Sequence, residues 1–392
     1  MFERDEDTVR DGRLLVTGYL RSGTTLVEKL LHNHPRVCVG AQPAPLLYVH
    51  LKELFLAERG LPAGAYPLSH LFRETGYTRE EFDRFCGRRV LTRADLDEVL
   101  ARQRSYSGWK TPEFEECWRE LRPGTLPDLF GQLGALLARL HGKPGARVRG
   151  AKEVLCEEFV PALLQQGIRV VLVLRDLRDV IASLNHGRGG EFGGRATPTL
   201  YAVRRWRLSV AYGLAHRDRP DFLLLRYEDL VDRFDPELLR LTDFLSVEPF
   251  QPGAFDGGIR DQAGGLWTGN SSFGAAEVVQ ARSVGSFERV LTEECIRYVE
   301  LFAGPELRAL GYRPAASTGP SPAAVVGAFV EPRPQTRENF DPDYSTDPAR
   351  IRAELRRLEA VDRPVPSDEI PHWFLYHAAH ERLRGASRPN AG

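Results

Sequence analysis

The chain has 392 residues, of which 42% are hydrophobic, enough apolar side chains for one large domain or two. Its 53 basic and 54 acidic side chains leave a net charge of -1, so no overall positive field exists that would recruit nucleic acid. The five cysteines are scattered without a C-x-x-C pair, which argues against a disulfide framework or a zinc site. The polar, acidic N-terminus is not typical of a signal peptide, and no run approaches the ~20 apolar residues that span a bilayer. We therefore expect a cytoplasmic protein without a membrane span.

Three short apolar runs predict buried strands: RLLVTG (13–18), IRVVLVLRD (168–176) and FLLLRYED (222–229). Runs that are apolar at every position suit strands covered on both faces, as in a parallel sheet. Helical stretches follow the first two runs at 24–32 and 178–184. After the third, Asp235 is a candidate N-cap with Pro236 at the first helical position. This alternation predicts an α/β fold with a central parallel sheet flanked by helices.

The region from 41 to 145 has helical patterns broken by Pro and Gly, and we interpret it as a mostly helical insertion that walls a cleft. We expect an α/β domain over 1–314 that contains this insertion, and a C-terminal extension over 315–392 with a loop and then two helices. Residues 187–194 hold five glycines and predict a mobile loop. In the last helix, Trp373, Phe374 and Tyr376 are expected to dock the extension onto the domain.

The first strand runs into a loop with the spacing of a phosphate-binding P-loop. Gly18 is followed by four residues, Gly23 and then Thr24-Thr25, but Thr24 stands where the lysine of an ATP-binding loop would be. A glycine-rich turn before a helix aims backbone N–H groups at one point, and the helix dipole favours an anion there. Arg21, inside the turn, supplies a cation. The loop can therefore hold a phosphate but lacks the group that handles a triphosphate.

The second strand ends at Arg175, where ligands bind in parallel sheets, and Ser183 lies eight residues further on. An arginine fork and a hydroxyl group together make a clamp for a second phosphate. The alternative is that Arg175 and its charged neighbours Asp176, Arg178 and Asp179 form surface ion pairs around the start of a helix.

Four blocks in this order resemble the motif set of the sulfotransferases that use 3′-phosphoadenosine-5′-phosphosulfate (PAPS). The blocks are RSGTTLVEKLLHNHP, GAKEVL, VVLVLRDLRDVIAS and LLLRYEDL. The resemblance covers roughly residues 13–314, with strong matches only in the blocks themselves. It implies a P-loop-like α/β fold, PAPS as donor, 3′,5′-adenosine bisphosphate (PAP) as product, and no metal.

The resemblance also implies roles for individual residues. The donor's 5′-phosphosulfate would be bound by Arg21, Ser22, Gly23, Thr24 and Thr25, with Arg21 also acting in catalysis. Its 3′-phosphate would be bound by Arg175 and Ser183, and Tyr227 would pack near the adenine. Lys152 would contact the transferred sulfuryl group or its bridging oxygen. Arg282 lies in a stretch similar to the segment that closes over the 3′-phosphate, displaced by a residue or two from the usual place.

The sequence departs from the family pattern at the general base. Cytosolic members have a histidine two residues after the lysine, where this chain has Val154. Tyrosine-sulfating members have a glutamate in a stretch that here contains Ala41 and Gln42. The remaining candidates are Glu153, His50, Glu113, Glu115 and Glu116, and the base stays unassigned. The stretch GWKTPEFEE (108–116) contains three of these and is also typical of a capped helix start at Thr111.

Two other functions stay open: a nucleotide-dependent phosphotransferase or NTPase with a degenerate P-loop, and a non-catalytic nucleotide-binding module. The first would need a Mg²⁺-binding carboxylate after a second strand, for which Asp176 is the candidate. The acceptor could be a carbohydrate, a phenolic or lipidic metabolite, or a tyrosine-containing peptide. An Arg-, Ala- and Gly-rich composition with one Met suggests a GC-rich bacterial genome. No pattern indicates an oligomeric state.

Overall fold

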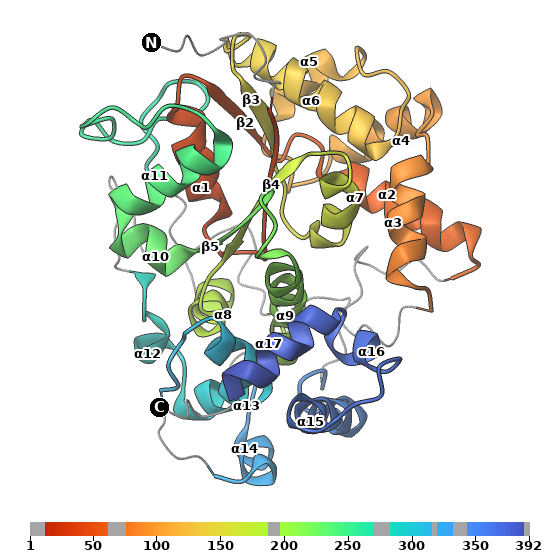
Figure 1. Cartoon of the computed structure of the whole chain (residues 1–392), viewed down its shortest axis with the longest axis vertical. Coiled ribbons are helices and arrows are strands. Elements are labelled where there is room, and N and C mark those ends of the chain that lie inside the picture. The colour runs from red at the N-terminus through yellow and green to blue at the C-terminus, as the bar shows by residue number, and fades with distance from the viewer. Residues whose placement is uncertain are drawn as a thin grey trace, which may run out of the picture.

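A computed structural model describes the chain over residues 12–61, 76–186, 197–269, 283–315, 320–331 and 343–387. Within these ranges a five-stranded sheet has the order β2-β3-β1-β4-β5, and every pair of neighbouring strands is parallel. The strands are β1 (Gly12–Thr17), β2 (Val37–Ala41), β3 (Val148–Lys152), β4 (Arg169–Leu174) and β5 (Phe222–Arg226). Helices lie on both sides of the sheet (Figure 1). The predicted fold class, a parallel sheet flanked by helices, is therefore confirmed.

The helices in the first half of the chain are α1 (Thr24–Asn33), α2 (Pro45–Glu58), α3 (Arg79–Arg88), α4 (Arg93–Gln103), α5 (Glu115–Trp118), α6 (Leu126–Leu140), α7 (Val160–Leu164) and α8 (Leu177–His186). Those in the second half are α9 (Thr199–His216), α10 (Tyr227–Asp232), α11 (Phe234–Leu245), α12 (Phe287–Val290), α13 (Glu293–Ala309), α14 (Pro322–Ala328), α15 (Pro348–Asp362), α16 (Ile370–Phe374) and α17 (His377–Ser387). Of the described residues, none belongs to a helix long and apolar enough to cross a membrane.

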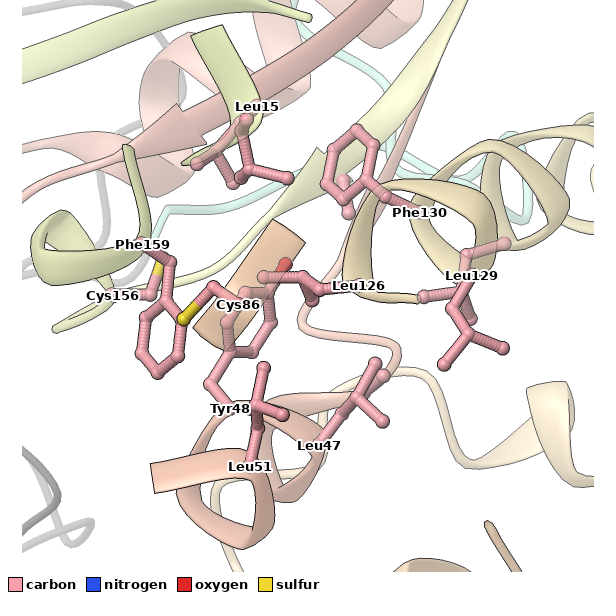
Figure 2. Close-up of a cluster of buried hydrophobic side chains, with 14 of the residues drawn as sticks. Leu15, Leu47, Tyr48, Leu51, Cys86, Leu126, Leu129, Phe130, Cys156 and Phe159 are labelled. Atoms are coloured by element: carbon pink, nitrogen blue, oxygen red, sulfur yellow. The ribbon is translucent and has the colours of Figure 1, made fainter. Parts of the chain in front are cut away.

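Alternate side chains of the strands enter two different cores, as the twofold repeat of a strand requires. Leu14 and Val16 of β1 pack with residues of α1 and α11. Leu15, from the same strand, faces the other way into a larger core built with α2, α6 and α7 (Figure 2). Burial on both faces is why β1, β4 and β5 read as continuous apolar runs.

The sequence did not predict β2 and β3. Strand β2 is apolar but only five residues long and contains Gly40, and β3 includes Arg149 and Gly150. Strand β2 pairs with β3, and β3 pairs also with β1; this pairing supplies hydrogen bonds that no local sequence pattern shows.

Two predicted helix caps are wrong. Helix α11 begins at Phe234 after the N-cap Arg233, so Asp235 lies inside its first turn and does not cap it. Thr111 makes no cap either, because its hydroxyl group donates to the Ala41 carbonyl at 2.6 Å; a 3₁₀ turn, Pro112–Phe114, and then the short helix α5 follow it. In both places a neighbouring segment decided the local structure.

The C-terminal helices α15, α16 and α17 pack beside α9 and α13 (Figure 1). The predicted docking residues are in place: Phe374 is buried, and the Tyr376 ring meets the rings of Tyr212 and His216 edge to face. Buried ion pairs add to this contact, since Glu354 of α15 accepts from Arg204 of α9 and pairs with Arg207 at 2.7 Å. The division of the chain at residue 315 stays a prediction.

We expect Glu354→Gln to lower the free energy of unfolding by about 3–5 kcal/mol, because it leaves two buried guanidinium groups without their carboxylate. Chemical denaturation of the full chain measures this loss. Glu359→Gln is the matched control on the same helix: Glu359 is 61% exposed and pairs with exposed Arg363, so little stability should be lost. Equal losses in the two variants would contradict a stabilising role for the buried pairs.

Candidate functional site

The loop between β1 and α1 has a shape that only its two glycines permit. Gly18 has φ 151°, and a Cβ atom there would lie 2.3 Å from the Val173 carbonyl oxygen of β4. Gly23 has φ 94°, and a Cβ atom there would lie 2.4 Å from Cδ2 of the Tyr227 ring. Both conformations are left-handed and both sites are crowded, so the backbone approaches β4 and Tyr227 closely because side chains are absent.

The start of α1 offers hydrogen-bond donors to an anion. Its N-cap residue is Gly23, which has no side chain to accept from the first N–H groups of the helix. Ser22 is fully buried, and its hydroxyl group has no hydrogen-bond partner within the described ranges. Thr24 is buried and Thr25 is half-buried beside it. A buried, unpartnered hydroxyl group next to a helix N-terminus is the arrangement that a phosphate or sulfate group would complete.

Arg21 joins the loop to α8. Its backbone is left-handed, with φ 63°, and its side chain is half-buried. The Arg21 Nε atom donates to the Ser183 hydroxyl oxygen at 2.8 Å. Two of the predicted binding residues, 162 positions apart in sequence, are therefore in direct contact.

Arg175 contacts the loop and also Ser283 and Tyr227. Its guanidinium group donates to the carbonyl oxygens of Arg21, at 3.3 Å, and Ser283, at 2.6 Å. The group lies 4.8 Å from the centre of the Tyr227 ring. The buried Arg175 Nε atom has no hydrogen-bond partner among the described residues. Arg175 therefore keeps one donor for a ligand while it contacts the other predicted binding residues.

Residues 283–287, named here the closing segment, are fixed to α8 by one carboxylate. Asp179 is fully buried and accepts from the Gly285 N–H at 2.8 Å, and from the Ser286 hydroxyl and the Phe287 N–H at 2.9 Å each. The Tyr227 hydroxyl is 2.9 Å from the Ser283 hydroxyl oxygen. The predicted residue Arg282 immediately precedes this segment and lies outside the described residues, as does the glycine-rich stretch 187–194.

The charged residues after β4 are not surface groups. Arg175, Asp176, Arg178 and Asp179 are at most 6% exposed, so the surface ion-pair alternative is wrong. Asp176 accepts from Arg178 Nε at 3.0 Å and from its terminal nitrogen at 2.6 Å. A carboxylate engaged by a guanidinium fork is poorly suited to bind Mg²⁺, as the NTPase alternative requires. No group of three or more His, Cys, Asp or Glu side chains in the described ranges could hold a metal ion.

Lys152 lies on the opposite side of the loop, at the end of β3. It pairs in register with Val16 of β1, and two backbone bonds tie the residues that follow it to β1 and the loop: Glu153 N–H to the Val16 carbonyl, and Leu155 N–H to the Gly18 carbonyl. Its side chain is 2% exposed, and Nζ donates to Gln42 Oε1 at 2.8 Å. The residues of the sequence blocks thus meet at the carboxyl edge of the sheet. No sequence pattern predicted the contact between Gln42 and Lys152.

Two buried carboxylates lie near Lys152. Burial raises the pKa of Glu28, on α1, to about 7, against opposing attraction from Lys29 and Lys152. Burial raises the pKa of Glu153 to about 8, although the Ala44 N–H donates to its Oε1 atom at 2.9 Å. The sequence reasoning missed Glu28, because nothing in a helical pattern shows that this position faces a charged neighbour.

The other candidate bases lie elsewhere. His50 contacts Asp95 at 3.0 Å, and Glu115 accepts from Arg104 at 2.6 Å, both on the helical insertion. Glu113 and Glu116 are exposed. The general base stays unassigned.

No protein-family model and no curated protein matches the sequence. Among solved structures, the sulfotransferase domain from the curacin biosynthetic pathway is similar, with 18% identity, 78% of this chain and 99% of that chain covered, and a TM-score of 0.42. The sulfotransferase domain of the Synechococcus PCC 7002 olefin synthase has 16% identity, coverages of 76% and 98%, and a TM-score of 0.39. A mouse sulfotransferase complexed with PAP has 12% identity, coverages of 75% and 84%, and a TM-score of 0.37. All three bear the name of the family that the sequence blocks resemble, but likenesses this distant carry no weight for the function of this chain.

We expect Glu28→Gln to flatten the dependence of stability on pH. The folded state raises the pKa of Glu28 from 4.5 to about 7, so the wild type loses stability as the pH rises through this window. The variant has no proton to lose there, and its stability relative to wild type should increase from pH 4.5 to pH 7. Urea denaturation at a series of pH values measures the difference, and a constant difference would contradict the raised pKa.

Proposed function

We propose that this protein is a sulfotransferase that transfers a sulfuryl group from PAPS to a hydroxyl or amine group of an acceptor. The observation that carries the proposal is the contact between two anion-binding features. Arg21 of the loop bonds Ser183, and Arg175 bonds the Arg21 carbonyl. A ligand with anionic groups at two separated positions fits such a pair of neighbouring sites, and PAPS carries a phosphosulfate and a separate 3′-phosphate.

The residues present fit this donor. The N–H groups at the start of α1 and the Ser22 hydroxyl group would hold the 5′-phosphosulfate, together with Arg21, Gly23, Thr24 and Thr25. Arg175, through its unpartnered Nε atom, and Ser183 would hold the 3′-phosphate. The Tyr227 ring, which lies against Gly23 and Arg175, would bound the adenosine. Arg282 remains a candidate for the 3′-phosphate because it precedes the closing segment.

When bound, PAPS supplies a sulfuryl group on a good leaving group. The contribution of the chain is to stabilise the charge that develops on that leaving group. Preorganised cations do this best where water is excluded, since they need no reorganisation during the reaction. Lys152 meets this requirement because it is buried at the loop and its Nζ atom is already oriented by Gln42. Arg21 contributes a second positive charge from within the loop.

Two features disfavour the alternatives. A triphosphate site would lack its loop lysine, since Thr24 occupies that position, and its candidate metal ligand Asp176 is bonded to Arg178. A pure nucleotide-binding module has no need of Lys152, whose burial carries a desolvation cost that a catalytic role would justify. Transfer therefore accounts for more of the described residues than either alternative.

Thermal-shift titration of the full chain tests the donor assignment. We expect PAP to raise the melting temperature more than 5′-AMP or ATP with Mg²⁺, because the chain provides for a 3′-phosphate and no γ-phosphate. A ligand at about 100 times its dissociation constant adds about 2.7 kcal/mol of stability. A larger shift with ATP and Mg²⁺ would overturn the proposal in favour of a nucleoside-triphosphate site.

We expect Arg175→Ala to weaken PAP binding by about tenfold to a hundredfold, as loss of a charge-assisted hydrogen bond does, and to weaken 5′-AMP binding far less. Calorimetric titration of both ligands gives the two ratios. Ser183→Ala, which removes only a hydroxyl group from the same clamp, should weaken PAP selectively with less risk to folding. Arg219→Ala is the control, because Arg219 pairs with Asp221 at the far end of β5. Equal losses for PAP and 5′-AMP would remove the clamp from its assigned role.

A further inference from the structure

Gln42 makes three hydrogen bonds that join two parts of the protein. Its backbone N–H donates to the Lys152 carbonyl at 2.7 Å, and its side-chain oxygen accepts from Lys152 Nζ at 2.8 Å. Its side-chain NH₂ group donates to the Gly108 carbonyl at 2.7 Å. The residue is 9% exposed and has φ 46°, a left-handed conformation that is uncommon for a residue with a side chain. Such strain persists only where the surroundings enforce it, and it concentrates at functional sites.

The two side-chain bonds fix which way the amide group points. A carbonyl oxygen can only accept, so the Gly108 carbonyl must face the NH₂ group. The amide oxygen is then directed at the Lys152 ammonium group, which can only donate. Neither a carboxylate nor an apolar side chain of similar size can make both bonds.

A neutral partner also matters for the charge of Lys152. The amide oxygen orients the ammonium group without cancelling its charge, whereas a carboxylate at the same distance would form a close ion pair with it. The titratable groups near Lys152 include Glu153, next in the chain, and Glu28 and Lys29 on α1; Lys110 lies two residues after Gly108.

The insertion is fixed to the same stretch of chain by further bonds. The Trp109 indole N–H donates to the Pro43 carbonyl at 3.0 Å, and the Thr111 hydroxyl donates to the Ala41 carbonyl. Residues 108–111 and the end of β2 are therefore one packed unit, and Gln42 is its contact with Lys152.

We propose that Gln42 is the positioning residue for Lys152, holding the ammonium group in place from the insertion side of the site. The inference rests on the proposed transfer of a sulfuryl group. Gln42 itself need not touch the donor or the acceptor, because it acts through Lys152.

The test measures single-turnover conversion of PAPS to PAP with enzyme in excess and p-nitrophenol as probe acceptor. The S–O bond of the donor breaks, PAP leaves with the electron pair, and the phenol oxygen takes the sulfuryl group and loses its proton to solvent. The variants are Gln42→Leu, Gln42→Glu and Lys152→Ala, each checked for folding by its thermal shift with PAP. Gln103→Leu is the matched control, because the buried Gln103 amide bonds the neighbouring Pro43 carbonyl at 3.0 Å and the Leu46 N–H.

We expect Gln42→Leu to slow conversion by about a hundredfold at every pH, as misplacement of a catalytic group does, with PAP binding unchanged. Gln42→Glu should be slow at high pH, where the carboxylate pairs with Lys152. It should recover relative to wild type as the pH falls, because a protonated carboxyl group can donate to Gly108 and accept from Lys152. Taking wild type as the reference at each pH removes the titration of Glu28 and Glu153.

Three results would overturn the inference: wild-type rates in Gln42→Leu, a Gln42→Glu variant as fast as wild type at high pH, or an equal loss of rate in Gln103→Leu. An equal loss in Gln103→Leu would show that the segment around Gln42 and Pro43 tolerates no change, irrespective of Lys152. A wild-type protein that binds PAP but leaves PAPS unconverted would instead reject the proposed function, and the role of Gln42 would fall with it.

Discussion

Three cations of the site each donate a hydrogen bond to a neutral oxygen. Arg175 bonds two backbone carbonyls, Arg21 bonds the Ser183 hydroxyl group, and Lys152 bonds the Gln42 amide oxygen. The nearest carboxylate to Arg175 is Asp179, at 3.8 Å, and its oxygens are occupied by the closing segment. Neutral acceptors orient a cation and leave most of its charge for an anionic ligand, so the geometry is preorganised without being neutralised.

Cations elsewhere in the fold are treated differently. Arg178 is paired with Asp176 and Glu300, and Arg204 with Glu354, all of them buried or nearly so. Burying a charge is costly unless a counter-charge and hydrogen bonds compensate, so these pairs serve the packing of α8, α9, α13 and α15. Arg175 and Arg178 are both buried, so burial does not distinguish them. They differ in their partners, since Arg178 donates to carboxylates and Arg175 donates to backbone carbonyls.

The sequence predicted what depends on local pattern and missed what depends on contact. Continuous apolar runs identified β1, β4 and β5, and glycine spacing identified the loop. Strands β2 and β3 were not predicted, because Val37–Ala41 and Val148–Lys152 are strands through their pairing with neighbours. The contacts of Gln42 were not predicted for a related reason: its partners lie 66 and 110 positions away in the sequence. From the sequence, Gln42 was noted only as a position where a carboxylate is missing. Thr111 does not form the expected helix cap, because its hydroxyl group donates to a backbone carbonyl of β2 instead.

The strand order explains why a loop without lysine can still serve transfer chemistry. In the order β2-β3-β1-β4-β5, the loop after β1 stands between β3 and β4. The β4 side carries Arg175 and Ser183, next to the closing segment, and under the proposed function these residues would clamp the nucleotide. The β3 side carries Lys152 and, through Gln42, the insertion. A lysine within the loop would place its charge over the phosphates, whereas a lysine on β3 approaches the loop from the side where the insertion can bring an acceptor. Under the proposed function, donor binding and sulfuryl transfer are thus assigned to opposite sides of one loop, with Arg21 between them.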